Sequence, residues 1–218
     1  MPPIATTRLM PIHFGSGRTV SDVIDYVANP EKTKNGELIS SFECDSKTAD
    51  AEFALSKRQY AQLTGRSQGG SDIIAYHTRQ AFHPDDDLTP EEANRIGMEL
   101  ALAFTKGKHS FVVCTHIDKN HIHNHIIFNS TALDCRRKFR NFIGSAFALR
   151  KISDRICVEH GVSIIKNPKP SRGHYGKWLD AMGGDRPISF QERLRQTIDA
   201  VLEKRPSDFE AFLADMQT

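Results

Sequence analysis

Hydrophobic positions along this chain follow two periods, and the change from one period to the other predicts an alternation of strands and helices. Short runs rich in β-branched and aromatic residues are typical of strands. Apolar residues three and four positions apart, as at Val20, Val23 and Val27, indicate a helix. Strands are expected within residues 4–14, 36–44, 71–82, 109–118 and 121–133, and helices within residues 21–28, 48–65, 89–104, 145–161, 189–205 and 207–217.

Residues with strong preferences for helix ends support two of these helices. Thr89, Pro90 and Glu92 have the spacing of a capping box with proline at the first helical position. Thr48 before one helix and Gly65 after it are a typical N-cap and C-terminal glycine. We therefore expect both helices to begin at a threonine.

The order of the elements predicts the fold class. Lys119 and Asn120 separate the last two strands, which favours a tight hairpin and an antiparallel pair. We expect an α+β fold in residues 1–165, with a central antiparallel sheet and helices on one face. Residues 166–218 are expected to form a basic loop and a helical C-terminal extension that is part of this domain or packs on it.

The composition is that of a globular protein, with 39% hydrophobic and 26% charged residues among 218. No apolar run approaches the roughly 18–20 residues that span a bilayer, and the N-terminus lacks the layout of a secretory signal. The four cysteines form no CxxC pair, which favours reduced thiols. These features predict a cytoplasmic protein with no membrane segment.

The net charge of the chain is only +2, but positive charge is concentrated in two segments. Residues 135–140, CRRKFR, and residues 166–177, KNPKPSRGHYGK, are basic. Such segments indicate a polyanionic partner or, equally, two solvated surface patches.

Residues 116–129, HIDKNHIHNHIIFN, combine four histidines with strand-forming isoleucines. In a strand, His123 and His125 lie on one face, and Ile126 on the other. Pairing of the two strands brings His116 next to His121 or His123. Three converging imidazoles favour a divalent metal site with open positions, and the alternative is a hydrogen-bonded polar cluster.

Three segments carry a resemblance to a known family. Residues 115–130, THIDKNHIHNHIIFNS, residues 23–33, VIDYVANPEKT, and residues 76–84, YHTRQAFHP, are similar to motifs of MOBP-type relaxases, the mobilisation nucleases of plasmids and conjugative transposons within the HUH endonuclease superfamily. The resemblance covers about residues 5–165. The sequence departs from it at Ala81, where serine is usual, so a hydroxyl contact is missing there.

The resemblance implies specific roles for residues of this sequence. Tyr26 is the nucleophile in the first motif, although a tyrosine in VIDYVA also fits a packed helix face. The metal ligands implied are His116, His123 and His125, and Asp118 and His121 are further catalytic candidates. Together with the basic segments, the resemblance suggests these DNA-binding residues: Lys32, His77, Arg79, Asn129, Arg136, Arg137, Lys138, Arg172 and Tyr175.

The function implied is that of a relaxase. Such an enzyme nicks one strand at an origin of transfer through a 5′-phosphotyrosine intermediate, with Mg or Mn as the favoured divalent metal, and can religate the strand. Its partners would be single-stranded or hairpin origin DNA, accessory relaxosome proteins and a coupling protein, in the bacterial cytoplasm. The alternatives are an inactive DNA-binding or replication-control module of the same fold and a histidine-metal hydrolase of another substrate.

Overall fold

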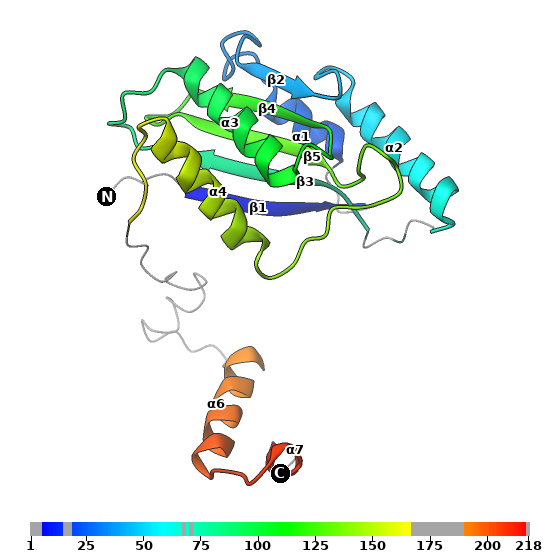
Figure 1. Cartoon of the computed structure of the whole chain (residues 1–218), viewed down its shortest axis with the longest axis vertical. Coiled ribbons are helices and arrows are strands. Elements are labelled where there is room, and N and C mark those ends of the chain that lie inside the picture. Colours follow the sequence, from blue (N-terminus) through cyan, green and yellow to red (C-terminus); the bar gives the residue numbers. More distant parts are fainter. Residues whose placement is uncertain (1–5, 15–18, 67–68, 70–71, 167–189, 217–218) are drawn as a thin grey trace. The chain divides into compact units, whose positions relative to one another are not determined.

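The computed structural model of the chain describes residues 6–14, 19–66, 69, 72–166 and 190–216, and the part up to residue 166 is built on a five-stranded antiparallel sheet (Figure 1). The strand order is β1-β3-β5-β4-β2, so the strand pair with the histidines lies inside the sheet. The predicted α+β class and antiparallel sheet are confirmed. The strands are β1 Thr6–His13, β2 Ile39–Phe42, β3 Ile73–Ala81, β4 Phe111–His116 and β5 His123–Asn129.

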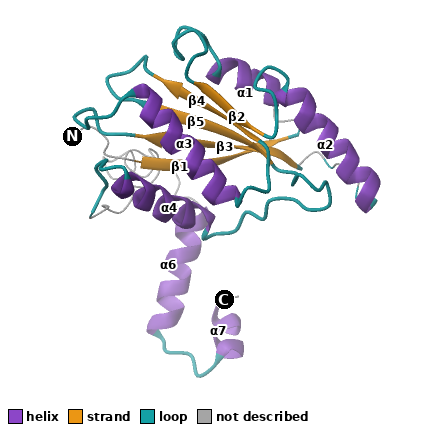
Figure 2. Ribbon diagram, turned by 45° about the horizontal axis from the view of Figure 1, so that its top comes forward, coloured by secondary structure: helices purple, strands orange, loops and turns teal. Residues whose placement is uncertain are grey.

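Helices cover both faces of the sheet, which corrects the expectation of helices on one face (Figure 2). Helices α3 and α4 pack on one face, and α1 and α2 pack on part of the other. The reason is that β4 is apolar on both sides: Val113 joins the core under α3, and Val112 joins the core under α1. The helix bounds are α1 Val20–Val27, α2 Ala49–Thr64, α3 Pro90–Thr105 and α4 Ser145–Glu159.

Of the two threonines predicted to cap helix N-termini, one does so. Thr89 and Glu92 form the predicted reciprocal capping box of α3. Thr48 precedes α2, but its side chain makes no capping bond to the helix backbone and donates instead to Glu52 at 2.7 Å. Gly65 ends α2 in the left-handed conformation, as expected.

The connection between β4 and β5 is longer than the predicted two-residue turn. It comprises residues 117–122. The first and last residues of this connection form hydrogen bonds to two different segments of the chain. The Ile117 amide donates to the Lys32 carbonyl at 3.1 Å, and the Phe82 amide donates to the Ile122 carbonyl at 3.1 Å. The strands nevertheless pair so that His116 lies directly opposite His123.

A buried polar network joins this part of the sheet to α3. The Asn124 side chain is fully buried and donates to the Ala93 carbonyl of α3 at 2.6 Å and to Gln80 of β3 at 3.1 Å. It also accepts a hydrogen bond from Thr115 of β4 at 2.7 Å. Gly97 permits this approach, because a Cβ there would stand 2.6 Å from Asn124 Nδ2. The network fixes β5 at the two histidines that flank Asn124.

Two further helices, α6 Phe190–Glu203 and α7 Phe209–Met216, confirm the predicted C-terminal helices. The chain divides into two compact units, Met1–Asn167 and Pro168–Thr218. The packing of the second unit on the first stays a prediction. No helix in the described ranges has the length and apolar character needed to cross a membrane.

Replacing Asn124 by alanine should destabilise the fold. The substitution removes three buried hydrogen bonds, to the Thr115 hydroxyl, to the Gln80 side-chain oxygen and to the Ala93 carbonyl, so the free energy of unfolding should fall by about 2–4 kcal/mol. Chemical denaturation measures this change. The matched control is Asn141→Ala, at an exposed loop position, which should change stability by less than about 0.5 kcal/mol. Equal effects of the two substitutions would contradict the role of the network.

Candidate active site

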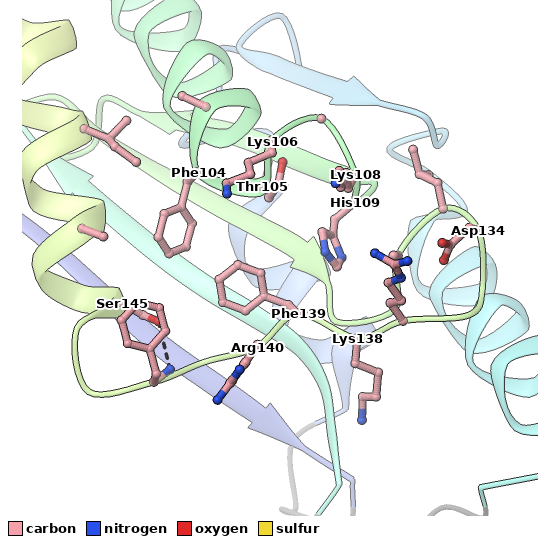
Figure 3. A pocket seen from close by; sticks show the side chains of 18 residues that line it. Phe104, Thr105, Lys106, Lys108, His109, Asp134, Lys138, Phe139, Arg140 and Ser145 are labelled. Atoms are coloured by element: carbon pink, nitrogen blue, oxygen red, sulfur yellow. Dashed lines mark hydrogen bonds between the residues drawn. The ribbon is translucent and has the colours of Figure 1, made fainter. Parts of the chain in front are cut away.

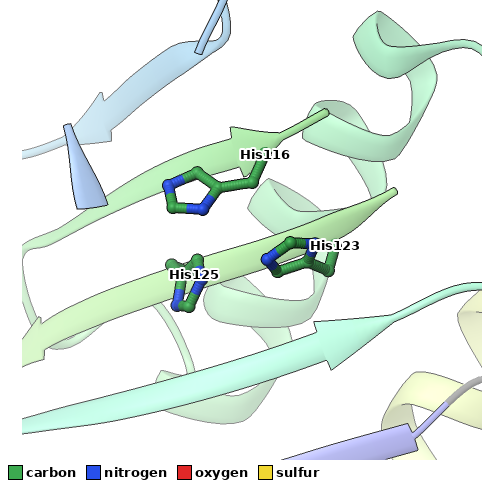
Figure 4. Close-up of side chains that lie close together, drawn as sticks. All are labelled: His116, His123 and His125. Atoms are coloured by element: carbon green, nitrogen blue, oxygen red, sulfur yellow. The ribbon is translucent and has the colours of Figure 1, made fainter. Parts of the chain in front are cut away.

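Three histidines predicted as metal ligands converge on one face of the sheet (Figure 4). His116 ends β4, and His123 and His125 lie on β5. One ring nitrogen from each lies within 4.8 Å of the others, so a single ion can contact all three. Three imidazoles leave coordination positions open, which is the pattern of a catalytic rather than a closed structural site.

The His116 ring is oriented by α1. Its Nε2 lies 2.8 Å from the backbone carbonyl oxygen of Val27, the last residue of that helix. A carbonyl only accepts, so Nε2 carries the proton and Nδ1 keeps the lone pair that binds a metal. A hydrogen bond from the second ring nitrogen to a carbonyl is a common way to fix a histidine ligand.

In the rings of His125 and His123, Nδ1 likewise contacts a hydrogen-bonding partner. His125 Nδ1 lies 2.7 Å from His77 Nε2, so one of these nitrogens donates to the other. If His125 binds an ion through Nε2, its Nδ1 is the donor. His123 Nδ1 contacts the carbonyl oxygen of His121 at 3.4 Å, which is a weak hydrogen bond. In both rings Nε2 is then the atom available to a metal.

Burial keeps these rings neutral. Desolvation, with smaller contributions from neighbouring imidazoles and Arg79, lowers the pKa of His125 to about 2. Desolvation also lowers the pKa of His123 to about 4 and lowers that of His116. Neutral imidazole is the form that binds a metal, so the cluster is ready to bind at pH 7 without losing protons.

Tyr26 on α1 lies directly beside this cluster and is 58% exposed. Its ring centroid is 6.4 Å from that of His116 and 6.3 Å from that of His125. The ammonium of Lys32 lies 4.2 Å from the centre of the tyrosine ring, and 4.0 Å from a carboxylate oxygen of Asp118. The tyrosine is thus reachable from solvent and next to the metal-binding atoms.

The rival tyrosines of the described region are in other surroundings. Tyr60 of α2 is 6% exposed. Tyr76 of β3 is 2% exposed and stacks on Phe128, with centroids 5.0 Å apart, on the opposite face of the sheet. Tyr175 and Arg172, both predicted to bind DNA, lie outside the described residues. Tyr26 is therefore the exposed tyrosine of the described part that adjoins the histidines.

Two arginines extend the site across the sheet. Arg79 of β3 pairs in register with His125 on one side and with Arg8 of β1 on the other, and both arginines are exposed. Together with Lys119 and His121 they line a hollow of about 370 Å³ that also reaches His123. Among the described residues, neither guanidinium forms an ion pair. Arg8 was not predicted from the sequence, because its place in the site depends on the pairing of β1 with β3.

Two other predicted site residues, Asn129 and His121, are not among the three converging histidines. Asn129 is 1% exposed, and its side-chain oxygen accepts from the Thr131 amide at 3.0 Å. Its burial corrects the expectation of a DNA contact. His121 lies beside His123, with centroids 5.2 Å apart, but is not one of the three converging ligands.

The basic segment after β5 lies at the other end of the strands. The Lys138 ammonium forms a close ion pair with Asp72, which Lys57 also contacts at 2.5 Å. Arg136 and Arg137 are exposed. These three residues therefore do not join the histidine cluster, and their contact with DNA stays a prediction.

The depressed pKa values predict a loss of stability in acid for the metal-free protein. The ordinary histidine pKa is 6.5, whereas His125 has a pKa of about 2 in the folded state. The unfolded chain therefore takes up a proton first, so stability present above pH 6.5 is lost as the pH falls. The His125 contribution between pH 7 and pH 5 is about 2 kcal/mol. Urea unfolding of wild type, His125→Gln and the control His160→Gln checks this. A fall as steep in His125→Gln as in wild type would refute it.

Several known proteins are similar to this chain. It is 31% identical to the group II intron-interrupted relaxase LtrB of Lactococcus lactis subsp. cremoris, over 88% of this chain and 39% of that protein. It is 29% identical to a protein rlx of Staphylococcus aureus, over 98% of this chain and 58% of that protein. A solved structure described as "Molecular Basis of Vancomycin Resistance Transfer in Staphylococcus aureus" aligns with a TM-score of 0.49 and 13% identity, over 74% of this chain and 96% of that chain.

The chain thus spans only 39–58% of the length of these two relatives. The family model for the MobA/VirD2-like relaxase nuclease domain matches residues 26–162, which is more than half of the chain and includes Tyr26 and all three converging histidines. The chain belongs to the relaxase family, as a MobA/VirD2-like nuclease domain.

Proposed function

We propose that this protein nicks one strand of DNA at an origin of transfer and remains attached to the 5′ end through Tyr26. The observation that carries the proposal is the position of an exposed tyrosine against two of three converging imidazoles. The phenolic oxygen attacks a backbone phosphorus, the bond between phosphorus and the 3′ oxygen breaks, and the 3′ oxygen takes a proton. The tyrosine proton passes to a base.

A divalent metal suits this reaction. Bound to the three histidines, it would supply charge that polarises the scissile phosphate, because neutral ligands leave its full charge in place. Imidazole ligands favour later transition metals in affinity, whereas Mg and Mn are the ions we propose in the cell. His116, His123 and His125 would hold it.

Two residues are candidates for the base. Asp118 lies near enough to His116 and His123 for its charge to oppose, in small part, the lowering of their pKa by desolvation, and its carboxylate is 4.0 Å from Lys32. His121 faces the hollow that contains His123. We favour Asp118, because Lys32 links it to the Tyr26 ring.

The DNA strand would approach the face of the sheet that carries the histidines, over the part that α1 and α2 leave uncovered. Like charges directly opposite each other on neighbouring strands destabilise a sheet. An anion near the facing pair Arg8 and Arg79 would relieve this repulsion, and a DNA phosphate would supply it. Lys119 lines the same hollow and adds a third cation.

The product retains the energy of the broken bond. A phosphotyrosine ester is chemically close to the phosphodiester that it replaces, so attack by a 3′ hydroxyl reseals the strand and releases Tyr26. This reversibility makes the proposed activity strand transfer as well as cleavage. We propose that the substrate is single-stranded or hairpin origin DNA in the bacterial cytoplasm, with accessory relaxosome proteins and a coupling protein as partners.

Removing the Tyr26 hydroxyl should abolish covalent attachment. Tyr26→Phe should form no protein–DNA adduct, and cleavage should fall about 10³-fold or more, because the nucleophile is lost. Oligonucleotides from the origin of the native element, with Mn or Mg, are analysed on denaturing protein gels. Tyr60→Phe is the matched control and should cleave like wild type. Cleavage that survives in Tyr26→Phe would favour a hydrolase, and DNA binding by wild type without any adduct would favour an inactive DNA-binding module.

Removing one ligand should weaken metal binding and cleavage together. His123→Ala should raise the dissociation constant for Mn by about 10-fold or more, since it removes one of three converging nitrogens. Calorimetric titration measures this affinity. His160→Ala is the control, because His160 lies on the surface and pairs with Glu99 at 2.9 Å. Unchanged Mn affinity in His123→Ala would rule out this metal site.

A further inference from the structure

A second hollow, of about 720 Å³, opens at the end of β4 and β5 opposite to the three histidines (Figure 3). Its walls are the C-terminal end of α3, the segment 132–145 and the first turns of α4. His109, which precedes β4, belongs to this wall, and His116 ends the same strand. Along the chain from His109 to His116 the two sites are about 24 Å apart, at roughly 3.4 Å per residue.

The rim of this hollow is strongly positive. Five cations line it, Lys106, Lys108, Arg137, Lys138 and Arg140, whereas Asp134 is its single carboxylate. Lys138 is neutralised by Asp72. The other four cations form no ion pair with any described residue. The hollow therefore carries an excess of positive charge that an anion would relieve.

Helix stabilisation explains only part of this charge. Lys106 and Lys108 follow the C-terminus of α3, where cations interact favourably with the helix dipole. Arg137 and Arg140 lie in an irregular segment, where no such role exists. No acidic residue stands in the first turn of α4, which adjoins them. The charge of Arg137 acts on Asp134 without a close ion pair, and Arg140 has no ion pair with a described residue.

The floor of the hollow is aromatic. In Figure 3 the rings of Phe104, from α3, and Phe139, from the segment before α4, lie next to each other, with centroids 5.3 Å apart. Phe142 lines the hollow as well and is 61% exposed, and Ile143 beside it is completely exposed. Flat apolar surfaces beside cations are what proteins use to bind unpaired bases and the phosphates that connect them.

We propose that this hollow is a second binding site for single-stranded DNA, in which a base stacks on Phe142 at the rim and Arg137 and Arg140 bind the flanking phosphates. The proposal rests on the proposed function for the identity of the strand, which is a part of the same DNA away from the scissile phosphate. A duplex would present its phosphates to the rim but no free base to Phe142. The site therefore selects an unpaired segment.

The test is a binding measurement that needs neither metal nor cleavage. Fluorescent oligothymidylate is titrated with Tyr26→Phe protein in chelator, and the affinity is measured by anisotropy at several salt concentrations. Adding Arg137→Gln with Arg140→Gln should lower the affinity at least about 10-fold and reduce the salt slope by about 1.4, or about 0.7 for each lost phosphate contact. Adding Phe142→Ala instead should lower the affinity about 5-fold or more with no change in slope.

The matched control is Arg95→Gln with Arg155→Gln, two exposed arginines of α3 and α4 that pair with Glu92 and Glu159. These substitutions should leave the affinity within about 2-fold. Photo-crosslinking with 5-iododeoxyuridine in the same oligonucleotide should label the peptide that contains Phe139 and Phe142.

In these measurements, three results would overturn the proposal. They are equal losses in the test and control pairs, an unchanged affinity in Phe142→Ala, and crosslinks confined to peptides outside residues 104–152. Displacement of the oligonucleotide by polyglutamate at equal charge would also overturn it, because it would show a general anion site. A missing covalent adduct in the Tyr26 experiment would refute the proposed nicking reaction and leave this binding result intact.

Discussion

Asn124 anchors the strand segment that carries two of the three converging imidazoles, and the geometry of the site depends on this anchor. Successive side chains of a strand point to opposite faces, so His123 and His125 project to the open side while Asn124 is buried on the other. Its bonds to α3, β3 and β4 fix the height and rotation of β5. A buried amide left without partners costs free energy, so the strand has little freedom to shift. The positions of His123 and His125 are therefore fixed by contacts on the opposite face of the sheet.

The second constraint is the link between the tyrosine and the metal cluster through α1. The carbonyl oxygen of Val27 holds the His116 ring, and Tyr26 is the preceding residue of the same helix. A movement of α1 would displace a candidate nucleophile and a ligand together. The contact of Lys32 with the Tyr26 ring and with Asp118 extends the link to the loop after β4. The two parts of the proposed chemistry are thus coupled by short local contacts.

Local patterns in the sequence predicted most of the fold and the centre of the site. The order of elements and the Thr89 capping box depend on nearby residues, and the convergence of the histidines follows from strand parity and the pairing of adjacent strands. Features that depend on distant segments were missed. The contact of His77 with His125 and the position of Arg8 opposite Arg79 arise from the pairing of β3 with β5 and β1. The long connection after β4 exists because Ile117 bonds to Lys32, far away in the chain.

The most direct test of this account is to identify the atom that becomes attached to DNA. The protein is incubated with Mn and single-stranded origin DNA, the adduct is digested with nuclease and protease, and the modified peptide is sequenced by mass spectrometry. We expect one nucleotide joined through its 5′ phosphate to Tyr26. Attachment to another residue such as Tyr175, or through a 3′ phosphate, would contradict it.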